Sequence, residues 1–255
     1  MIKPAAPALD YPLASGVLAL ASGCAFLTHS RVLLCADAHF GYEDVMGGGG
    51  ALPLWSTAEI ATTIAIAAQQ TAAREIVFLG DAIHGAGMSE GASRVVAAAL
   101  EGLRAHANLT FVAGNHEGRS RGAAILGATV ESCERDGWTL VHGDKPAATG
   151  ARGIIGHLHP SLHMGGGTSA PAFLGSPRVV VVPALTPYSS GLDVLSDECI
   201  AALASWDVQR RDLHVVVATN ERVYPFGTLS ALRGALRRPQ PRAANPYFRR
   251  RLRPD

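Results

Sequence analysis

Residues 32–40 read VLLCADAHF, an apolar run that ends in an aspartate and a histidine two residues apart. Short, uniformly apolar runs are typical of strands that are buried on both faces. Further apolar runs along the chain lead in the same way into Gly80-Asp81, Gly114-Asn115-His116-Glu117, His142-Gly143-Asp144 and Gly156-His157-Leu158-His159. Each of these predicted strands therefore carries polar side chains at its C-terminal end.

We expect these polar side chains to lie close together. The C-terminal ends of strands in an open α/β sheet gather along one edge, where such folds bind ligands. The side chains offer carboxylate, imidazole and amide oxygen but no thiolate, which favours manganese, iron or zinc over copper or an iron–sulfur cluster. This many ligands suits two adjacent divalent ions. One such motif alone is more often ordinary turn chemistry, but all of them in this order predict a metal site.

The remaining pattern indicates an α/β protein with two sheets. Strands are expected at residues 17–21, 25–28, 32–35, 76–79, 109–112, 138–141, 153–155, 179–182 and 213–217. The Ala-rich segments 57–73 and 89–105 are predicted helices, because each opens with Ser or Thr followed by an acid. Alternating strands and helices in the first half predict parallel strands joined by right-handed crossovers. The strand-rich second half predicts another sheet packed on the first, with flexible glycine-rich loops at 47–50 and 165–167.

The composition bounds the class of protein. The chain has 255 residues, 48% apolar and 17% charged, which excludes a disordered, collagen-like or coiled-coil protein. We expect one domain at residues 1–232, followed by a mobile tail at 233–255 that holds eight Arg, one acid and several Pro. The body then carries 14 basic and 20 acidic residues, a formal charge of −6, against +7 for the tail. Such a tail either binds phosphate backbones or is simply solvated.

Cysteines and apolar runs indicate the compartment. Cys24, Cys35, Cys133 and Cys199 form no CxxC pair, which argues against a disulfide scaffold and a zinc–thiolate site. No apolar run approaches the roughly 18 residues that a membrane-spanning helix needs. Prolines interrupt the N-terminal stretch that faintly resembles a lipoprotein signal. We therefore expect a cytoplasmic protein without a membrane partner.

Taken together, the motifs resemble those of the calcineurin-like metallophosphoesterase superfamily, D-x-H, GD, GNH[DE], H and GHxH in that order. The match covers residues 32–160 and fills every ligand position. The resemblance implies a four-layer α/β/β/α sandwich of two mixed sheets, with a dinuclear metal centre at the strand tips. The ligands it implies are Asp37, His39 and His159 for one metal, Asn115, His142 and His157 for the other, and Asp81 bridging both. His116 is then available to the leaving group or the scissile phosphate.

A finer resemblance points to the branch of this superfamily related to DNA-repair nucleases, including its ligase-associated bacterial members. It rests on ADAHFGYE at residues 36–43, PALTP at 183–187 and SGLD at 190–193. Two departures, Ala38 for the usual Leu and Glu117 for the commoner Asp, leave the ligand positions unchanged.

His84 distinguishes two activities within the superfamily. Residues 80–84 read GDAIH, similar to the GD-x-x-H of the repair nucleases, whereas Ser/Thr protein phosphatases carry an Arg-Gly pair after GD-x-x-D. A protein phosphatase is therefore not expected, and the resemblance implies that His84 contacts phosphate or DNA. The alternative is a loop histidine with a backbone partner. Arg119 and Arg121 are candidate phosphate clamps or, alternatively, surface charges at the start of a helix.

The leading prediction is a dinuclear-metal phosphodiesterase, a hydrolase that uses manganese, with iron or zinc as alternatives, and acts as a nuclease in DNA repair. Nucleic acid as substrate and DNA-repair proteins as partners follow from it. The alternative is a small-molecule phosphodiesterase acting on cyclic nucleotides or nucleotide pyrophosphates, which the acidic body favours because it repels duplex DNA. A noncatalytic scaffold is disfavoured, since no ligand position is degenerate. Nothing in the sequence indicates an oligomeric state.

Substrate choice is expected to depend on two loops that face the metals, residues 47–53 and 165–176. A deep, walled pocket would favour nucleotides. An open groove would favour DNA.

Overall fold

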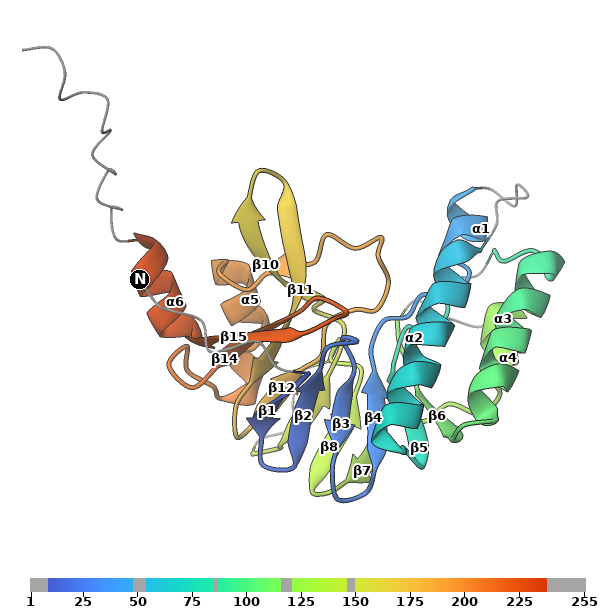
Figure 1. The fold of residues 1–255 in the computed structure, drawn as a ribbon, viewed down its shortest axis with the longest axis horizontal. Helices are drawn as coiled ribbons and strands as arrows, with labels where there is room; N and C mark the ends of the chain where they lie inside the picture. The colour runs from blue at the N-terminus through green and yellow to red at the C-terminus, as the bar shows by residue number, and fades with distance from the viewer. Residues whose placement is uncertain (1–8, 48–53, 85–86, 116–120, 146–149, 238–255) are drawn as a thin grey trace, which may run out of the picture.

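The structure, a computed structural model, describes residues 9–47, 54–84, 87–115, 121–145 and 150–237. Its strands form two mixed sheets, with helices on either side of them (Figure 1). The predicted α/β class with two sheets is therefore confirmed.

The first sheet has six strands in the order β1-β2-β3-β4-β5-β6. Their bounds are β1 Asp10–Ala14, β2 Val17–Leu20, β3 Ala25–Leu27, β4 Val32–Cys35, β5 Glu75–Leu79 and β6 Asn108–Val112. Pairing is antiparallel from β1 to β4 and parallel from β4 to β6, as the strand-helix-strand pattern predicts. The parallel pairs bring the C-terminal ends of β4, β5 and β6 to the same edge.

The second sheet follows the order β13-β10-β11-β12-β9-β8-β7, with β14 paired to β11 and β15 paired to β14. Its strands are β7 Cys133–Arg135, β8 Trp138–Val141, β9 Gly153–Ile155, β10 Pro160–Gly165, β11 Thr168–Gly175, β12 Val179–Val181, β13 Leu192–Asp193, β14 His214–Ala218 and β15 Val223–Thr228. Strands β8, β9 and β12 run parallel. The ends of β8 and β9 therefore also share an edge.

Helices cover the outer faces of the two sheets. They are α1 Tyr42–Met46, α2 Trp55–Thr71, α3 Glu90–Arg104, α4 Arg121–Leu126, α5 Asp197–Ala202, the 3-10 helix η1 Ala204–Trp206 and α6 Leu229–Arg237. Figure 1 shows α2, α3 and α4 on one side of the sheets and α5 and α6 on the other.

Three apolar cores separate the four layers. Phe78 of β5 packs with α2 and α3 in one core, whereas its neighbour Val77 points the opposite way, into a core shared with Phe173 of the second sheet. This alternation is the period of two that a strand imposes on its side chains. A third core joins the second sheet to Leu203 and to Leu232 of α6. Each large apolar side chain buried in this way contributes about 1.5–3 kcal/mol, which holds the sandwich together.

Three strands were not predicted from the sequence, because they contain proline. Strands β1, β11 and β15 hold Pro12, Pro171 and Pro225, and proline removes a ladder hydrogen bond and weakens the pattern of a strand. Because β11 occupies Thr168–Gly175, the expectation of a substrate-facing loop at residues 165–176 is wrong. Gly166 and Gly167 form the turn of the β10–β11 hairpin, both with positive φ, and β11 follows.

The predicted helices are present with shifted bounds. Helix α3 begins after Ser89, whose Oγ accepts the backbone N–H of Ala92 at 3.2 Å, as the capping pattern predicts. Helix α2 begins at Trp55, earlier than predicted and without a side-chain cap. Helix α6 runs across the expected domain boundary at residue 232 as far as Arg237. Residues 48–53 and 238–255, and with them most of the predicted loop and tail, lie outside the described residues.

The described cysteines are all free thiols, in line with the absence of a disulfide scaffold. Cys24 and Cys35 nevertheless lie together, with their Sγ atoms 3.6 Å apart and buried beside the paired strands β3 and β4. Within the described ranges, no helix combines the length and the apolar character that a membrane crossing needs.

Candidate metal centre

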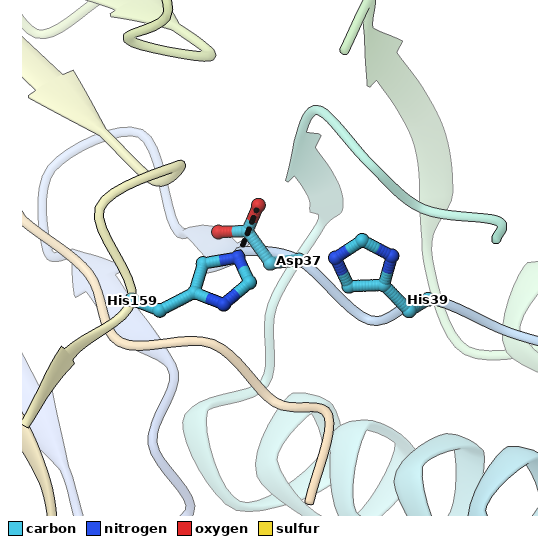
Figure 2. Close-up of side chains that lie close together, drawn as sticks. All are labelled: Asp37, His39 and His159. Carbon is cyan, nitrogen blue, oxygen red and sulfur yellow. Dashed lines mark ion pairs between the residues drawn. The ribbon is translucent and has the colours of Figure 1, made fainter. Parts of the chain in front are cut away.

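Asp37, His39 and His159 come together at the edge where the two sheets meet. Asp37 and His39 follow β4, and His159 immediately precedes β10. Their ligand atoms all lie within 4.8 Å of one another. Figure 2 shows Asp37 between the two imidazole rings, with His159 Nε2 at 3.2 Å from Asp37 Oδ1. These three residues form a first possible cation position.

A second group shares Asp37 with the first. Asp37, Asp81 and His142 also place one ligand atom each within 4.8 Å of the others, and all three are buried. His142 Nε2 lies 3.4 Å from Asp81 Oδ2, 2.9 Å from Asn115 Oδ1 and 3.1 Å from His157 Nδ1. Side chains from three other segments therefore converge on one imidazole nitrogen of His142. The carboxylate of Asp37 belongs to both groups.

The backbone at these residues is strained. Positive φ angles occur at Asp37 (49°), His39 (46°), Asp81 (46°), His157 (62°) and His159 (44°). Side chains other than glycine rarely adopt this left-handed conformation, which costs about 1–2 kcal/mol per residue. Such strain persists only where the surrounding structure imposes it, and it clusters at functional sites. The turns after β4, β5 and β9 thus adopt a backbone conformation that is unfavourable by itself. In this conformation their side chains point toward one another.

Two glycines allow the strand tips to approach each other. A Cβ atom on Gly114 would overlap Asp81, both at its Oδ1 and at its backbone nitrogen. A Cβ atom on Gly80, where φ is 85°, would overlap the ring of His142. The glycines that precede Asp81 and Asn115 are therefore required by contact with the site itself.

The electrostatics of the group favour a positive charge. Burial alone would lower the pKa of His142, but the hydrogen bond and charge of Asp81, with the charge of Asp37, outweigh it and raise that pKa to about 9. Asp37 Oδ1 is buried and accepts no hydrogen bond from the described residues. A buried carboxylate oxygen that accepts no hydrogen bond is costly, and a cation at this point would satisfy it.

His39 behaves differently. Its burial, together with repulsion from His159 and His84, lowers its pKa to about 4 despite the attraction of Asp37 and Asp81. A neutral imidazole is the form that binds metal. Two carboxylates, an amide oxygen and imidazoles, of which His39 is already neutral, form a donor set that fits manganese, iron or zinc.

No protein-family model matches the sequence, and no curated protein matches it. Among solved structures, the chain is similar to the crystal structure of Pseudomonas putida nuclease MPE, with a TM-score of 0.62 and 20% sequence identity. The match covers 82% of this chain and 94% of that chain. The two proteins share a fold. At 20% identity this likeness shows a common architecture. The chemistry of the site depends on the residues described above.

His84 lies beside the candidate ligands. Its Nδ1 is 3.0 Å from Nδ1 of His39, and its ring is 4.6 Å from that of Tyr42. Its backbone N–H donates to the carbonyl of Phe40. His84 therefore has the backbone partner expected of an ordinary loop histidine, and it also contacts the candidate site.

His116, Glu117 and Arg119 lie outside the described residues, and Arg121 begins α4.

Two groups that orient the imidazoles carry no recognisable sequence signal. Ser189 Oγ lies 2.7 Å from His159 Nδ1, so the opposite nitrogen, Nε2, faces Asp37. The carbonyl of Leu79 lies 2.9 Å from His142 Nδ1 and accepts a hydrogen bond from its N–H, which leaves Nε2 toward Asp81. Such partners set the tautomer and the ring orientation of a ligating histidine. Ser189 borders the SGLD motif, but no pattern marks it as a partner of His159.

Proposed function

We propose that the protein is a metal-dependent phosphodiesterase of the calcineurin-like type that acts as a nuclease. The observation that carries this proposal is the buried Oδ1 of Asp37, which accepts no hydrogen bond from the described residues although Asp37 belongs to both groups of ligand atoms. Asp37, His39 and His159 would hold one ion, and Asn115, His142 and His157 would hold the other. Asp81 would contact both, next to the carboxylate of Asp37, which contributes a ligand atom to each group.

The chemistry follows from this arrangement. Two divalent ions, manganese first with iron or zinc as alternatives, would activate water and withdraw charge from the phosphoryl oxygens. Ser189 and the Leu79 carbonyl keep the imidazoles oriented. His84 would contact a phosphate oxygen at the rim of the site. His116 would donate the proton that the departing oxygen needs.

Nucleic acid is the proposed substrate. The likeness in fold to a nuclease supports it, as do the GDAIH sequence at residues 80–84 and the outer motifs of the repair-nuclease branch. A role in DNA repair, alongside repair proteins, is part of the same proposal.

One observation favours a second candidate function. A cavity of about 490 Å³ lies beside His142, lined among others by Gly114, Thr139, Lys145 and Trp206. That volume is typical of pockets that enclose a small ligand. A cyclic nucleotide or a nucleotide pyrophosphate would fit there with its phosphate near the metals.

The test is phosphodiesterase activity of the metal-stripped chain, measured with and without added Mn²⁺. Single-stranded DNA, bis-p-nitrophenyl phosphate and a 2′,3′-cyclic nucleotide are compared. We expect DNA cleavage that requires Mn²⁺, falls at least a hundredfold in His116→Ala, and is unchanged in the matched control His163→Ala. Turnover of the small diesters with intact DNA would favour the second candidate. Bound metal with no turnover of any substrate would refute both.

A further inference from the structure

A row of aromatic rings leads away from the candidate metal centre. His39, His84, Tyr42 and Tyr188 follow one another with ring centroids 5.1, 4.6 and 4.5 Å apart. The outermost pair, Tyr42 and Tyr188, is stacked, with only 12° between the ring planes. Tyr188 is 46% exposed although its inner face is covered by Tyr42. The row therefore ends in an aromatic surface that remains accessible to solvent.

Hydrogen bonds hold this outer pair in place. The Tyr188 hydroxyl donates to Glu43 Oε1 at 3.0 Å, and the backbone N–H of Ser56 donates to the same oxygen at 2.8 Å. The residue after Tyr188 is Ser189, which orients His159. The ring is thus held by its hydroxyl bond to Glu43 and by its stack on Tyr42, so a ligand that stacks on it costs little side-chain entropy on the protein side.

The two helices that carry Glu43 and Ser56 also expose large apolar side chains. Trp55 precedes Ser56 at the start of α2 and is 74% exposed, and Met46 at the end of α1 is 64% exposed. Among Tyr42, Glu43, Ser56 and Tyr188, the charged side chain is the carboxylate of Glu43. The row therefore offers ring faces beside a negative charge, which suits a flat neutral group better than a phosphate.

We propose that Tyr188, backed by Tyr42, is a stacking platform for a base of a single-stranded nucleic acid whose scissile phosphate lies at the metals. This rests on the proposed nuclease function and specifies its substrate. Bases in a duplex are stacked on each other and do not present their faces, whereas unpaired bases do. Stacking on aromatic side chains is sequence-tolerant, because every base has a π face. The platform thus selects single strands over duplexes without selecting a sequence.

The experiment compares kcat/KM of the full chain with Mn²⁺ on three substrates. These are a short single strand, the same strand with abasic residues substituted in turn along it, and p-nitrophenyl methyl phosphate, which carries no base. The variants are Tyr188→Ala, Tyr188→Phe and the control Met164→Ala, which removes an exposed apolar side chain from β10.

We expect Tyr188→Ala to lower kcat/KM on the intact strand by roughly tenfold or more, mainly through KM. Tyr188→Phe keeps the ring and should retain most activity, and Met164→Ala should behave like the wild type. All variants should hydrolyse p-nitrophenyl methyl phosphate at the wild-type rate. The wild type should discriminate against an abasic residue at one position of the strand, and Tyr188→Ala should lose that discrimination.

Two outcomes would overturn the platform while leaving the nuclease intact. One is an equal loss in Tyr188→Ala on the strand and on the small diester, which would mean that Tyr188 only supports Ser189 and His159. The other is a wild type that cleaves intact and abasic strands equally well. If no DNA is cleaved, the proposed function fails. The platform is then tested separately, by measuring the binding of labelled single strands through their fluorescence anisotropy. Base-dependent binding lost in Tyr188→Ala would support it, and base-independent binding or none would overturn it.

Discussion

The backbone N–H of His157 donates to Asp37 Oδ2 at 2.9 Å and so joins two residues 120 positions apart. Asp37 follows β4 in the first sheet, and His157 follows β9 in the second. With Oδ2 held in this way, Oδ1 is left toward His159 and His142. The candidate metal centre is therefore built across the junction of the two sheets, and binding a metal there should stabilise the whole sandwich.

We predict that Asp37→Asn abolishes stabilisation by metal. At a free Mn²⁺ concentration about 100 times Kd, binding should stabilise the wild type by about 2.7 kcal/mol. The variant lacks the carboxylate that both ligand groups share, so its Tm should not respond. Thermal unfolding with and without Mn²⁺ measures this, and Glu90→Gln on the exposed face of α3 is the control. An equal Mn²⁺ response in Asp37→Asn would refute the site.

Gly114→Ala and Gly102→Ala form a matched pair. The new methyl group at residue 114 would overlap Asp81, so we expect destabilisation by roughly 1–3 kcal/mol and weaker Mn²⁺ binding. At Gly102, inside α3, nothing lies within 4 Å of the added atom, and the variant should gain about 0.5–1 kcal/mol. Chemical denaturation of both variants measures the difference. Equal effects at the two positions would contradict the close approach at Asp81.

Ser189→Ala should weaken metal binding without unfolding the protein. The variant removes the hydroxyl that bonds Nδ1 of His159, so the ring is free to rotate its Nε2 away from Asp37. Loss of such a partner typically costs tenfold to a hundredfold in metal affinity. Calorimetric titration with Mn²⁺ gives the affinity, and Ser189→Thr, which keeps the hydroxyl, should restore most of it. Unchanged affinity in Ser189→Ala would show that the contact does not orient the ligand.

A charged pair between the sheets predicts a pH dependence of stability. Arg135 of β7 donates to both carboxylate oxygens of Glu75 of β5, at 2.9 and 2.8 Å. Burial raises the pKa of Glu75, but hydrogen bonds from Arg135 and Thr110 and the charge of Arg135 outweigh it and lower that pKa. Because the folded pKa lies below the unfolded value of about 4.3, the stabilisation is complete above that pH and is lost as pH falls through the folded pKa.

Arg135→Met should therefore cost about 1–3 kcal/mol at neutral pH, and the difference from the wild type should shrink below about pH 4. Urea unfolding across this pH range gives the free energies. The exposed pair Arg94 and Glu90, at 3.4 Å, supplies the control: Arg94→Met should change stability by less than about 0.5 kcal/mol. A deficit in Arg135→Met that stayed constant down to pH 2 would rule out Glu75 as its source.

The candidate site is more predictable from sequence than the sheets that support it. Apolar runs such as residues 32–36 and the polar residues at their ends are local features, and their order alone indicates strand tips that meet at one edge. In the structure, Asp37, His39, Asp81, Asn115, His142, His157 and His159 lie within one cluster, and their role as ligands stays a proposal. The sequence did not predict strands β1, β11 and β15, because Pro12, Pro171 and Pro225 interrupt their strand pattern. Pairing with neighbouring strands nevertheless holds these segments as strands.

The sequence by itself determined the α/β class and the residue types at the strand tips, because burial periodicity and turn chemistry act over a few residues. Only the tertiary structure decided which distant side chains meet. Ser189 reaches His159, and Tyr188 stacks on Tyr42 and bonds Glu43, because the segment between β12 and β13 crosses over the end of β4. The backbone N–H of Leu185 donates to the Ala36 carbonyl at that crossing. Such contacts depend on how two sheets pack, which no local pattern encodes.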